Sequence, residues 1–234
     1  MTTTAHDNMS FLEHLEELRW HVIRSLIAII SAGFICFLMK DFIFDTIIFG
    51  PKKMDFPTYK FLCQAATFIG VETTFCGDEF PFVVQNRTMA GQFSAHVMTS
   101  VIAGFIISFP YVLYEFWKFI SPGLLAKEKS KSRGFIFISS LLFFIGVLFG
   151  YYIICPLSIN FLGTYQVSSE VLNEIDLGSF ISLVRSSAIA SGIIFELPII
   201  IYFLTKAGVV TPKSLVKYRK YALVLVLILA AIIT

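Results

Sequence analysis

Four long apolar runs constrain the fold of this chain more than any other feature. They cover about residues 20–39, 96–114, 135–155 and 180–205. Each is close to the ~20 residues that an α-helix needs to cross a hydrocarbon core of ~30 Å. Hydrophobic residues make up 56% of the sequence and charged residues only 15%, which is too apolar for a single soluble core. The pattern predicts an all-α, multi-spanning membrane protein that folds as one domain over residues 1–234.

A fifth apolar run begins near residue 221 and continues to the last residue, Thr234. Its roughly fourteen residues are few for a membrane span. A charged chain end left in hydrocarbon is also costly. We therefore expect a span that is cut short, in a sequence that is a fragment of a longer protein.

Basic residues in the loops predict the orientation of the spans. The segment between the second and third runs holds five Lys or Arg residues, and so does the segment between the fourth and fifth runs. Residues 156–178 hold none and carry three acidic residues. Because cytoplasmic loops retain positive charge, we expect the N-terminus to be cytoplasmic. Residues 40–91 then form a long external loop, which is periplasmic in a bacterium.

The four cysteines fall into two classes. Cys36 and Cys155 lie in apolar runs, where a cysteine behaves as a small buried hydrophobic residue. Cys63 and Cys76 lie in the external loop, with twelve residues between them. A disulfide between them is one possibility if the loop faces an oxidising compartment, and two free thiols are the other.

Two carboxylates precede spans that start on the same side of the membrane. Residues 1–19 are expected to form a cytoplasmic amphipathic helix, and its residue Glu17 comes just before the first span. Glu128 comes just before the third span. Two carboxylates on one rim suit a ligand with paired guanidinium groups, because each group can make a bidentate, charge-assisted contact. The alternative is a solvated acidic face, with Glu128 neutralising the lysines around it.

Glu196 lies well inside the fourth run, where an ionisable side chain is costly unless it is paired, hydrated or protonated. Such a residue is a functional candidate by default. The alternative is a protonated carboxyl group that hydrogen-bonds to a neighbouring helix. Arg185 is eleven residues away, about 16 Å along a helix, and cannot pair with Glu196 within it. Pro198, two residues on, predicts a kink in this span.

Motifs for catalysis or for cofactors were not found in the sequence. The four histidines have no metal-ligand spacing with each other or with the cysteines. No nucleotide-binding glycine loop, nucleophile elbow or zinc-protease motif occurs. The 18 basic and 16 acidic residues are too balanced to favour nucleic acid. We expect a protein that is not an enzyme and that has no cofactor, metal or nucleic-acid partner.

Several segments resemble the TatC family, the membrane receptor subunit of the twin-arginine protein translocase. They are His-Leu-Glu-Glu-Leu-Arg at 14–19, Tyr-Glu-Phe-Trp-Lys-Phe-Ile-Ser-Pro-Gly-Leu at 114–124, Ser-Ser-Leu-Leu-Phe at 139–143, Phe-Glu-Leu-Pro at 195–198 and Gly-Val-Val-Thr-Pro at 208–212. The resemblance covers nearly the whole chain from about residue 11. It is weakest in the first external loop, which looks longer than usual. The sixth span of the family is absent.

The resemblance implies a function, a location and a set of site residues. A TatC-like protein of the bacterial cytoplasmic (inner) membrane would bind the twin-arginine signal peptides of folded cargo proteins. It would assemble with TatA-type and TatB-type single-span partners, and with copies of itself, for export driven by the proton-motive force. Residue by residue, the implied set is Glu17 and Glu128 as signal-peptide carboxylates, Leu18, Arg19 and Phe119 beside them, Glu196 as an intramembrane contact for signal peptide or partner, and Pro51 as an external-loop proline that is important for assembly.

A proton-coupled solute transporter is the competing hypothesis. An intramembrane carboxyl group such as that of Glu196 is also what a proton relay requires. Solute uptake by the isolated protein would favour this alternative, whereas export that depends on partner proteins would favour the receptor.

Overall fold

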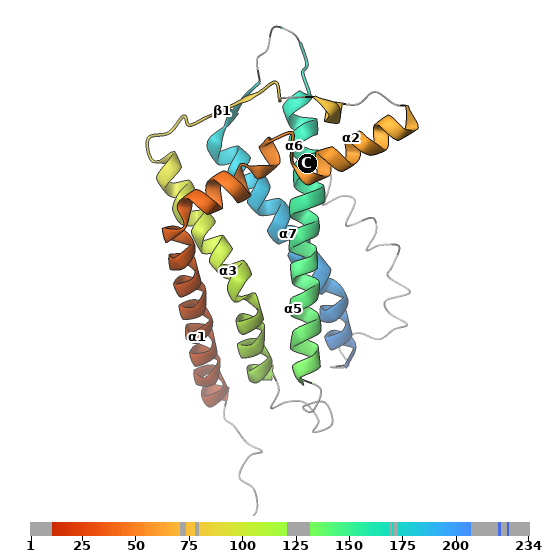
Figure 1. Cartoon of the computed structure of the whole chain (residues 1–234). Helices are drawn as coiled ribbons and strands as arrows, with labels where there is room; N and C mark the ends of the chain where they lie inside the picture. The colour runs from red at the N-terminus through yellow and green to blue at the C-terminus, as the bar shows by residue number, and fades with distance from the viewer. Residues whose placement is uncertain are drawn as a thin grey trace, which may run out of the picture.

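A bundle of four long helices forms the body of the molecule (Figure 1). The computed structural model describes residues 11–70, 74–77, 80–120, 132–168, 170, 173–206, 220 and 224. Within these residues, four helices are long and apolar enough to cross a membrane: Leu15–Leu38, Gly91–Ile120, Gly134–Thr164 and Leu177–Tyr202. The four predicted spans are therefore confirmed as helices of spanning length. The fifth apolar run falls almost entirely outside the described residues.

The spans alternate in direction. Helix α1 (Phe11–Leu38) and helix α5 (Ser132–Phe149) start at the same end of the bundle, and α3 (Gly91–Ile120) and α7 (Leu177–Lys206) return to it (Figure 1). The π-helix η5 (Gly150–Ile154) and helix α6 (Cys155–Thr164) continue α5 beyond the bundle. Helix α1 is continuous from residue 11, so the predicted N-terminal helix runs without a break into the first span, while residues 1–10 lie outside the described part.

Helices α1 and α3 approach so closely that their backbones touch at two glycines. A Cβ atom on Gly104 would lie 2.4 Å from the Gly33 nitrogen and 2.6 Å from the Ile29 carbonyl oxygen. Neither backbone atom can move without separating the helices. The contact fixes the register of the pair, and it is the most extensive packing between any two of the described elements.

Helices α5 and α7 approach in the same way. A Cβ atom on Gly146 would lie 2.7 Å from the Ser191 carbonyl oxygen and 2.9 Å from the Gly192 Cα atom. In a bilayer, small residues at such crossings allow helices to associate by close packing. The bundle is thus built from two tight helix pairs, α1 with α3 and α5 with α7.

Shorter elements form a cap at the end of the bundle opposite the start of α1 (Figure 1). The cap consists of η1 (Phe42–Ile48), η2 (Gly50–Lys52), α2 (Pro57–Ile69), η3 (Thr74–Cys76), β1 (Val83–Gln85), α6 and β2 (Glu174–Asp176). Strands β1 and β2 pair in parallel, with Val83 opposite Glu174. The segment predicted as a long loop is therefore largely folded, and the prediction of an all-α chain did not include this small sheet.

Tyr59 holds the centre of the cap together. Its side chain is fully buried, and its hydroxyl group lies 2.9 Å from the Pro51 carbonyl oxygen and 3.0 Å from that of Pro156. Burial raises the pKa of the Tyr59 phenol, which keeps its proton available for donation. Pro51 is itself fully buried in η2. One side chain thereby connects α2, η2 and α6.

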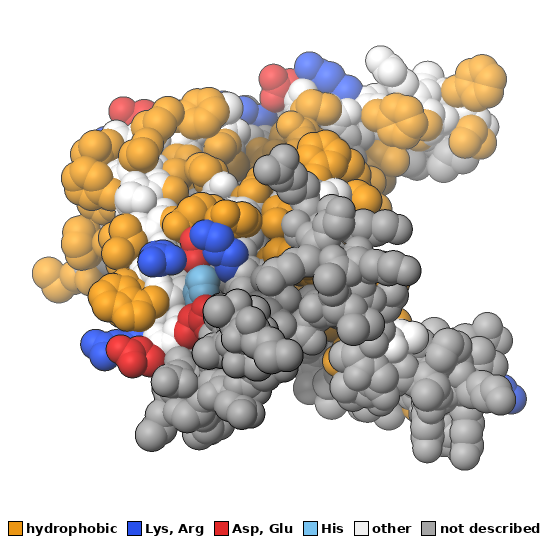
Figure 2. Space-filling model, turned by 90° about the horizontal axis from the view of Figure 1, so that it is seen from below, with side chains coloured by type: hydrophobic (Ala, Val, Ile, Leu, Met, Phe, Trp, Pro, Cys, Tyr) orange, Lys and Arg blue, Asp and Glu red, His pale blue; other side chains and the backbone are white. Residues whose placement is uncertain are grey.

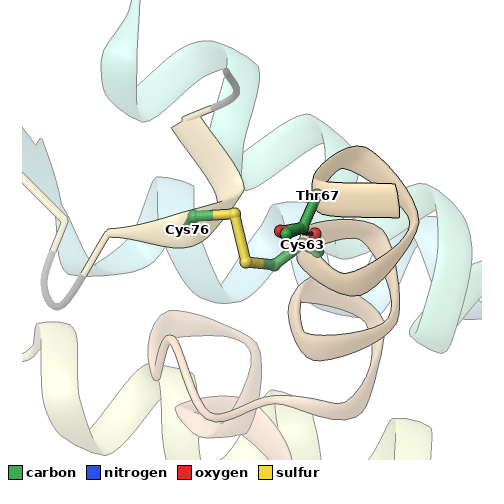
Figure 3. The surroundings of a disulfide bond; sticks show 3 residues. All are labelled: Cys63, Thr67 and Cys76. Atoms are coloured by element: carbon green, nitrogen blue, oxygen red, sulfur yellow. Dashed lines mark hydrogen bonds between the residues drawn. A yellow bond between two sulfur atoms is a disulfide. The ribbon is translucent and has the colours of Figure 1, made fainter. Parts of the chain in front are cut away.

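A disulfide joins Cys63 of α2 to Cys76 of η3 (Figure 3). Thr67, one turn after Cys63, donates a hydrogen bond of 2.8 Å to the Cys63 carbonyl oxygen. Of the two possibilities that the sequence left open for these cysteines, the structure contains the bridge. Cys36 and Cys155 are free and buried.

Candidate functional site

A buried acid–base pair connects α1 and α3 near the end of the bundle where α1 begins. The Nδ1 atom of His21 lies 2.6 Å from the Glu115 carboxylate, and only 2% of the Glu115 surface is exposed. A carboxylate can only accept, so the histidine nitrogen donates. His21 and Glu115 are twelve and eleven residues from the touching glycines Gly33 and Gly104 in antiparallel helices. The glycine contact therefore brings them to the same height.

Three more side chains lie around the His21–Glu115 pair. The guanidinium group of Arg24 lies 3.9 Å from the same carboxylate oxygen, and the Tyr111 side chain is hydrogen-bonded to Glu115. The Phe119 ring lies 6.2 Å from the His21 ring in an edge-on arrangement. The Glu115 carboxylate is thus engaged within the chain by a histidine and a phenol, with a guanidinium group nearby.

Sequence reasoning missed His21, Arg24 and Glu115 as site residues. It treated His21 only as one histidine without a ligand spacing, and it ended the second span one residue before Glu115. A usable signal was present, because both ionisable residues lie at span ends that face the same side of the membrane. An ionisable group in such a position requires a partner.

The predicted residues of this rim lie in different places. Glu17 is half-buried and lies one turn before His21, on the same face of α1. Within the described part of the chain, no ion pair or hydrogen bond engages the Glu17 carboxylate. Leu18 is half-buried beside it, whereas Arg19 is exposed and lies about 200° around the helix from Glu17. The structure therefore places Glu17 and Phe119 each one turn from the His21–Glu115 pair, towards the end of the bundle where α1 begins, and Arg19 on another face of α1.

Glu128 lies outside the described residues. The helices on either side of it in the sequence, α3 and α5, have Ile120 and Ser132 at the end of the bundle where α1 begins (Figure 1). Viewed from that end, acidic, basic and histidine side chains gather between hydrophobic ones (Figure 2). This end of the bundle is the only part of the spans where the described structure contains an ion pair.

Glu196 lies inside the bundle on α7. It is 7% exposed, and its carboxyl group accepts a hydrogen bond of 2.5 Å from Ser139 of α5. Its other oxygen, Oε1, is buried without a hydrogen-bond partner among the described residues. The packing of Gly146 against Ser191 positions this contact, because Ser139 and Glu196 follow within two turns towards the same end of the bundle. Pro198 lies two residues after Glu196 in the same helix. Because proline has no N–H group, the Ile194 carbonyl group loses its helical hydrogen bond.

Arg185 is the second ionisable residue inside α7. Its Nε and Nη1 atoms are buried and have no hydrogen-bond partner among the described residues. The structure contains no ion pair between Arg185 and Glu196, as their separation along the helix predicts. Arg185 and Glu196 are therefore two separate polar residues in the span.

These features define a class of protein: a multi-spanning helical membrane protein with a polar site at one membrane face and a carboxyl group buried between its spans. The chain belongs to the TatC family, since residues 13–234 match the sequence model of the family described as Sec-independent protein translocase protein (TatC). It is therefore a membrane protein of protein transport, of the family that provides a translocase subunit.

Individual relatives agree with this assignment. The TatC protein of Blattabacterium sp. subsp. Periplaneta americana is 46% identical over 229 residues, which cover 97% of this chain and 86% of that protein. The TatC protein of Aquifex aeolicus is 34% identical, over 96% of this chain and 84% of that protein. A crystal structure described as the twin arginine translocase receptor TatC in DDM has a TM-score of 0.73 and 33% identity, and the match covers 95% of this chain and 88% of that one.

Proposed function

We propose that this chain is the receptor subunit of a twin-arginine translocase. It binds the twin-arginine signal peptides of folded proteins at the membrane face where α1 begins, with Glu17 and Glu128 as the arginine-binding carboxylates. Leu18 and Phe119 provide apolar contact beside them, and Arg19 lies nearby on the other side of α1. The solved structure of similar fold, described as a twin arginine translocase receptor, supports this proposal.

One observation carries the proposal: Glu17 is half-buried and has no ion pair or hydrogen bond with the described residues, and it lies one turn from His21, which is paired with the buried Glu115 carboxylate. Because His21 and Arg24 occupy Glu115, this inner acid does not compete for an incoming guanidinium group. The outer carboxylate, that of Glu17, is half-buried, and a charge-assisted bond is stronger in such a place than in open water. His21 and Glu115 are positioning residues in this account, since they fix α1 against α3.

The orientation follows from the loop charges. Five basic residues lie between the second and third apolar runs of the sequence, and two of them, Lys118 in α3 and Arg133 in α5, are at the helix ends of the proposed binding face. Cytoplasmic loops retain such residues. We therefore infer that this face and the N-terminus are cytoplasmic, that the cap is external, and that the membrane is the bacterial cytoplasmic membrane. Signal peptides made in the cytoplasm then reach Glu17 and Glu128 directly.

Glu196 is proposed as a contact for the signal peptide or for TatA-type and TatB-type single-span partners. One oxygen of its carboxyl group accepts from the Ser139 hydroxyl group, and the other has no described partner. A polar group on an incoming helix would form a hydrogen bond with that second oxygen. Assembly with these partners and with further copies of the chain would allow export driven by the proton-motive force.

The test is cross-linking of the protein in membranes to a peptide that carries consecutive arginines. Glu17→Gln and Glu128→Gln should each weaken the cross-link about tenfold, because each loses one charge-assisted contact. Glu16→Gln, which removes an exposed carboxylate from the same helix, is the matched control and should change it less. A peptide with two lysines in place of the arginines should bind worse than the original. Unchanged cross-linking in both glutamate variants would contradict the proposal.

A proton-coupled solute transporter is the second candidate, and the buried Glu196 carboxyl favours it. The two functions separate in proteoliposomes that contain this protein alone. Uptake of a solute driven by a pH gradient, and lost in Glu196→Gln, would support the transporter. Export that requires single-span partners and a twin-arginine signal would support the receptor.

A further inference from the structure

Helix α2 of the cap has an exposed apolar face that no described residue covers. Phe61, Ala65, Phe68 and Ile69 follow one another at the spacing of a single helix face. The exposed fractions are 70% for Phe61, 93% for Phe68 and 73% for Ile69. We call these four residues the outer face of α2.

The rest of the helix fixes the direction of this face. Tyr59 and Ala66, on the opposite side, are buried in the cap. Lys60 and Gln64 lie on an exposed polar side between the two. Cys63 borders that polar side, and its disulfide holds η3, which lies above α2 on the side away from the spans (Figure 1). The outer face therefore points away from both the cap core and η3.

The height of α2 follows from its contacts with the third span. Thr58, in the first turn of α2, donates a hydrogen bond to the Tyr152 carbonyl oxygen, and the Phe56 ring stacks on the Tyr152 ring at 5.4 Å. Tyr152 is eighteen residues from the start of the span at Gly134, about 27 Å at the helical rise. This is close to the ~30 Å thickness of a hydrocarbon core. Tyrosines gather at that boundary.

Helix α2 thus begins at the level of the outer boundary of the hydrocarbon core. It runs at an angle to the spans and projects sideways from the bundle (Figure 1). The spans, like this outer face, have many exposed large hydrophobic side chains. We propose that α2 is an interfacial helix, whose outer face inserts into the outer boundary of the lipid bilayer between headgroups and acyl chains. Its only charged residue, Lys60, lies on the polar side, where it can reach the headgroups.

The size of the face favours lipid over a second copy of the chain. Two phenylalanines and one isoleucine offer on the order of 500 Å². A stable protein interface needs about 800 Å² from each partner. Lipid imposes no such minimum, because it covers any apolar surface at the right depth.

Tryptophan fluorescence in nanodiscs that hold one copy of the full chain tests the proposal. Phe61→Trp puts the probe on the outer face, and Thr67→Trp is the matched control on the polar side, about 120° around the same helix. Both positions are exposed, so neither change should disturb folding. Trp20 and Trp117 lie near the other membrane face, and their signal is measured in the parent protein and subtracted.

Lipids brominated near the headgroup end of the acyl chains should quench the Phe61→Trp probe at least about twofold more than the Thr67→Trp probe, as expected for a helix half-immersed in the boundary. Aqueous iodide should show the reverse order. Equal quenching of both probes by iodide, with none by brominated lipid, would overturn the proposal. So would protection from iodide that develops only in nanodiscs with two copies, because a second chain would then cover the face.

Discussion

Among the described residues, two carboxyl groups are buried between the helices, and their surroundings differ. Glu115 receives a hydrogen bond from His21 at 2.6 Å and lies near Arg24 and Tyr111. Glu196 has Ser139 alone, and one of its oxygens has no described partner. Glu115 connects α1 to α3, and Glu196 connects α5 to α7.

This difference indicates different roles. A buried charge surrounded by bases and donors is satisfied within the chain and stabilises the helix pair that contains it. A buried carboxyl with a spare oxygen leaves hydrogen-bonding capacity for a group from outside, which is the usual significance of an intramembrane ionisable residue. Glu115 therefore fits a positioning role, and Glu196 fits a contact with a partner helix.

The largest expected effect comes from separating the helices that hold Glu115. Gly104→Ala places a Cβ atom within 2.6 Å of backbone atoms of α1, which cannot rotate away. We expect a loss of at least about 3 kcal/mol in the free energy of unfolding, measured by thermal unfolding in detergent. Gly134→Ala is the matched control, because a Cβ atom at Gly134 meets nothing within 4 Å. Similar unfolding temperatures for the two variants would show that the close approach does not fix the pair.

Next in size is the loss of the Glu115 charge. Glu115→Gln keeps the shape of the side chain but removes the charge-assisted bond to His21 and the attraction of Arg24. The free energy of unfolding should fall by about 2 kcal/mol. Thermal unfolding of the same preparations measures it. A change below the error of the assay would mean that the pair is not a structural connection.

Glu196→Gln should have the smallest effect on stability. The amide oxygen still accepts from Ser139, so we expect a change of less than about 1 kcal/mol. Cross-linking to single-span partners in membranes should nevertheless decrease, because the spare oxygen is altered. If Glu196→Gln destabilised the protein as much as Glu115→Gln, the two carboxyls would share one structural role and the comparison would fail.

The spans and Glu196 were predictable because they depend on local properties of the sequence. Runs of spanning length define the helices, and a carboxyl inside such a run is conspicuous whatever it contacts. The His21–Glu115 pair was not predictable in this way. The two residues are 94 positions apart in the sequence. They meet only because Gly33 and Gly104 let two helix backbones touch, and the spacing of apolar residues does not predict such a contact.

The contacts within the cap were not predictable from the sequence either. The spacing of Cys63 and Cys76 allowed a disulfide but did not require one. Tyr59 looked like an ordinary aromatic residue in a loop, because its acceptors are main-chain carbonyls of Pro51 and Pro156, 8 and 97 positions away. Contacts of a side chain with distant backbone leave no pattern of residue types from which to predict them.

The central claim is that the Glu17 carboxylate binds an arginine of the signal peptide, and a double-mutant cycle tests it most directly. Peptide affinity is measured for the parent protein and Glu17→Gln, each with the twin-arginine peptide and with a peptide that has one arginine replaced by lysine. The account predicts that the two changes together cost less than the sum of their separate effects, with a coupling of about 1–2 kcal/mol for one of the two arginines. Additive losses for both arginines would contradict a direct contact.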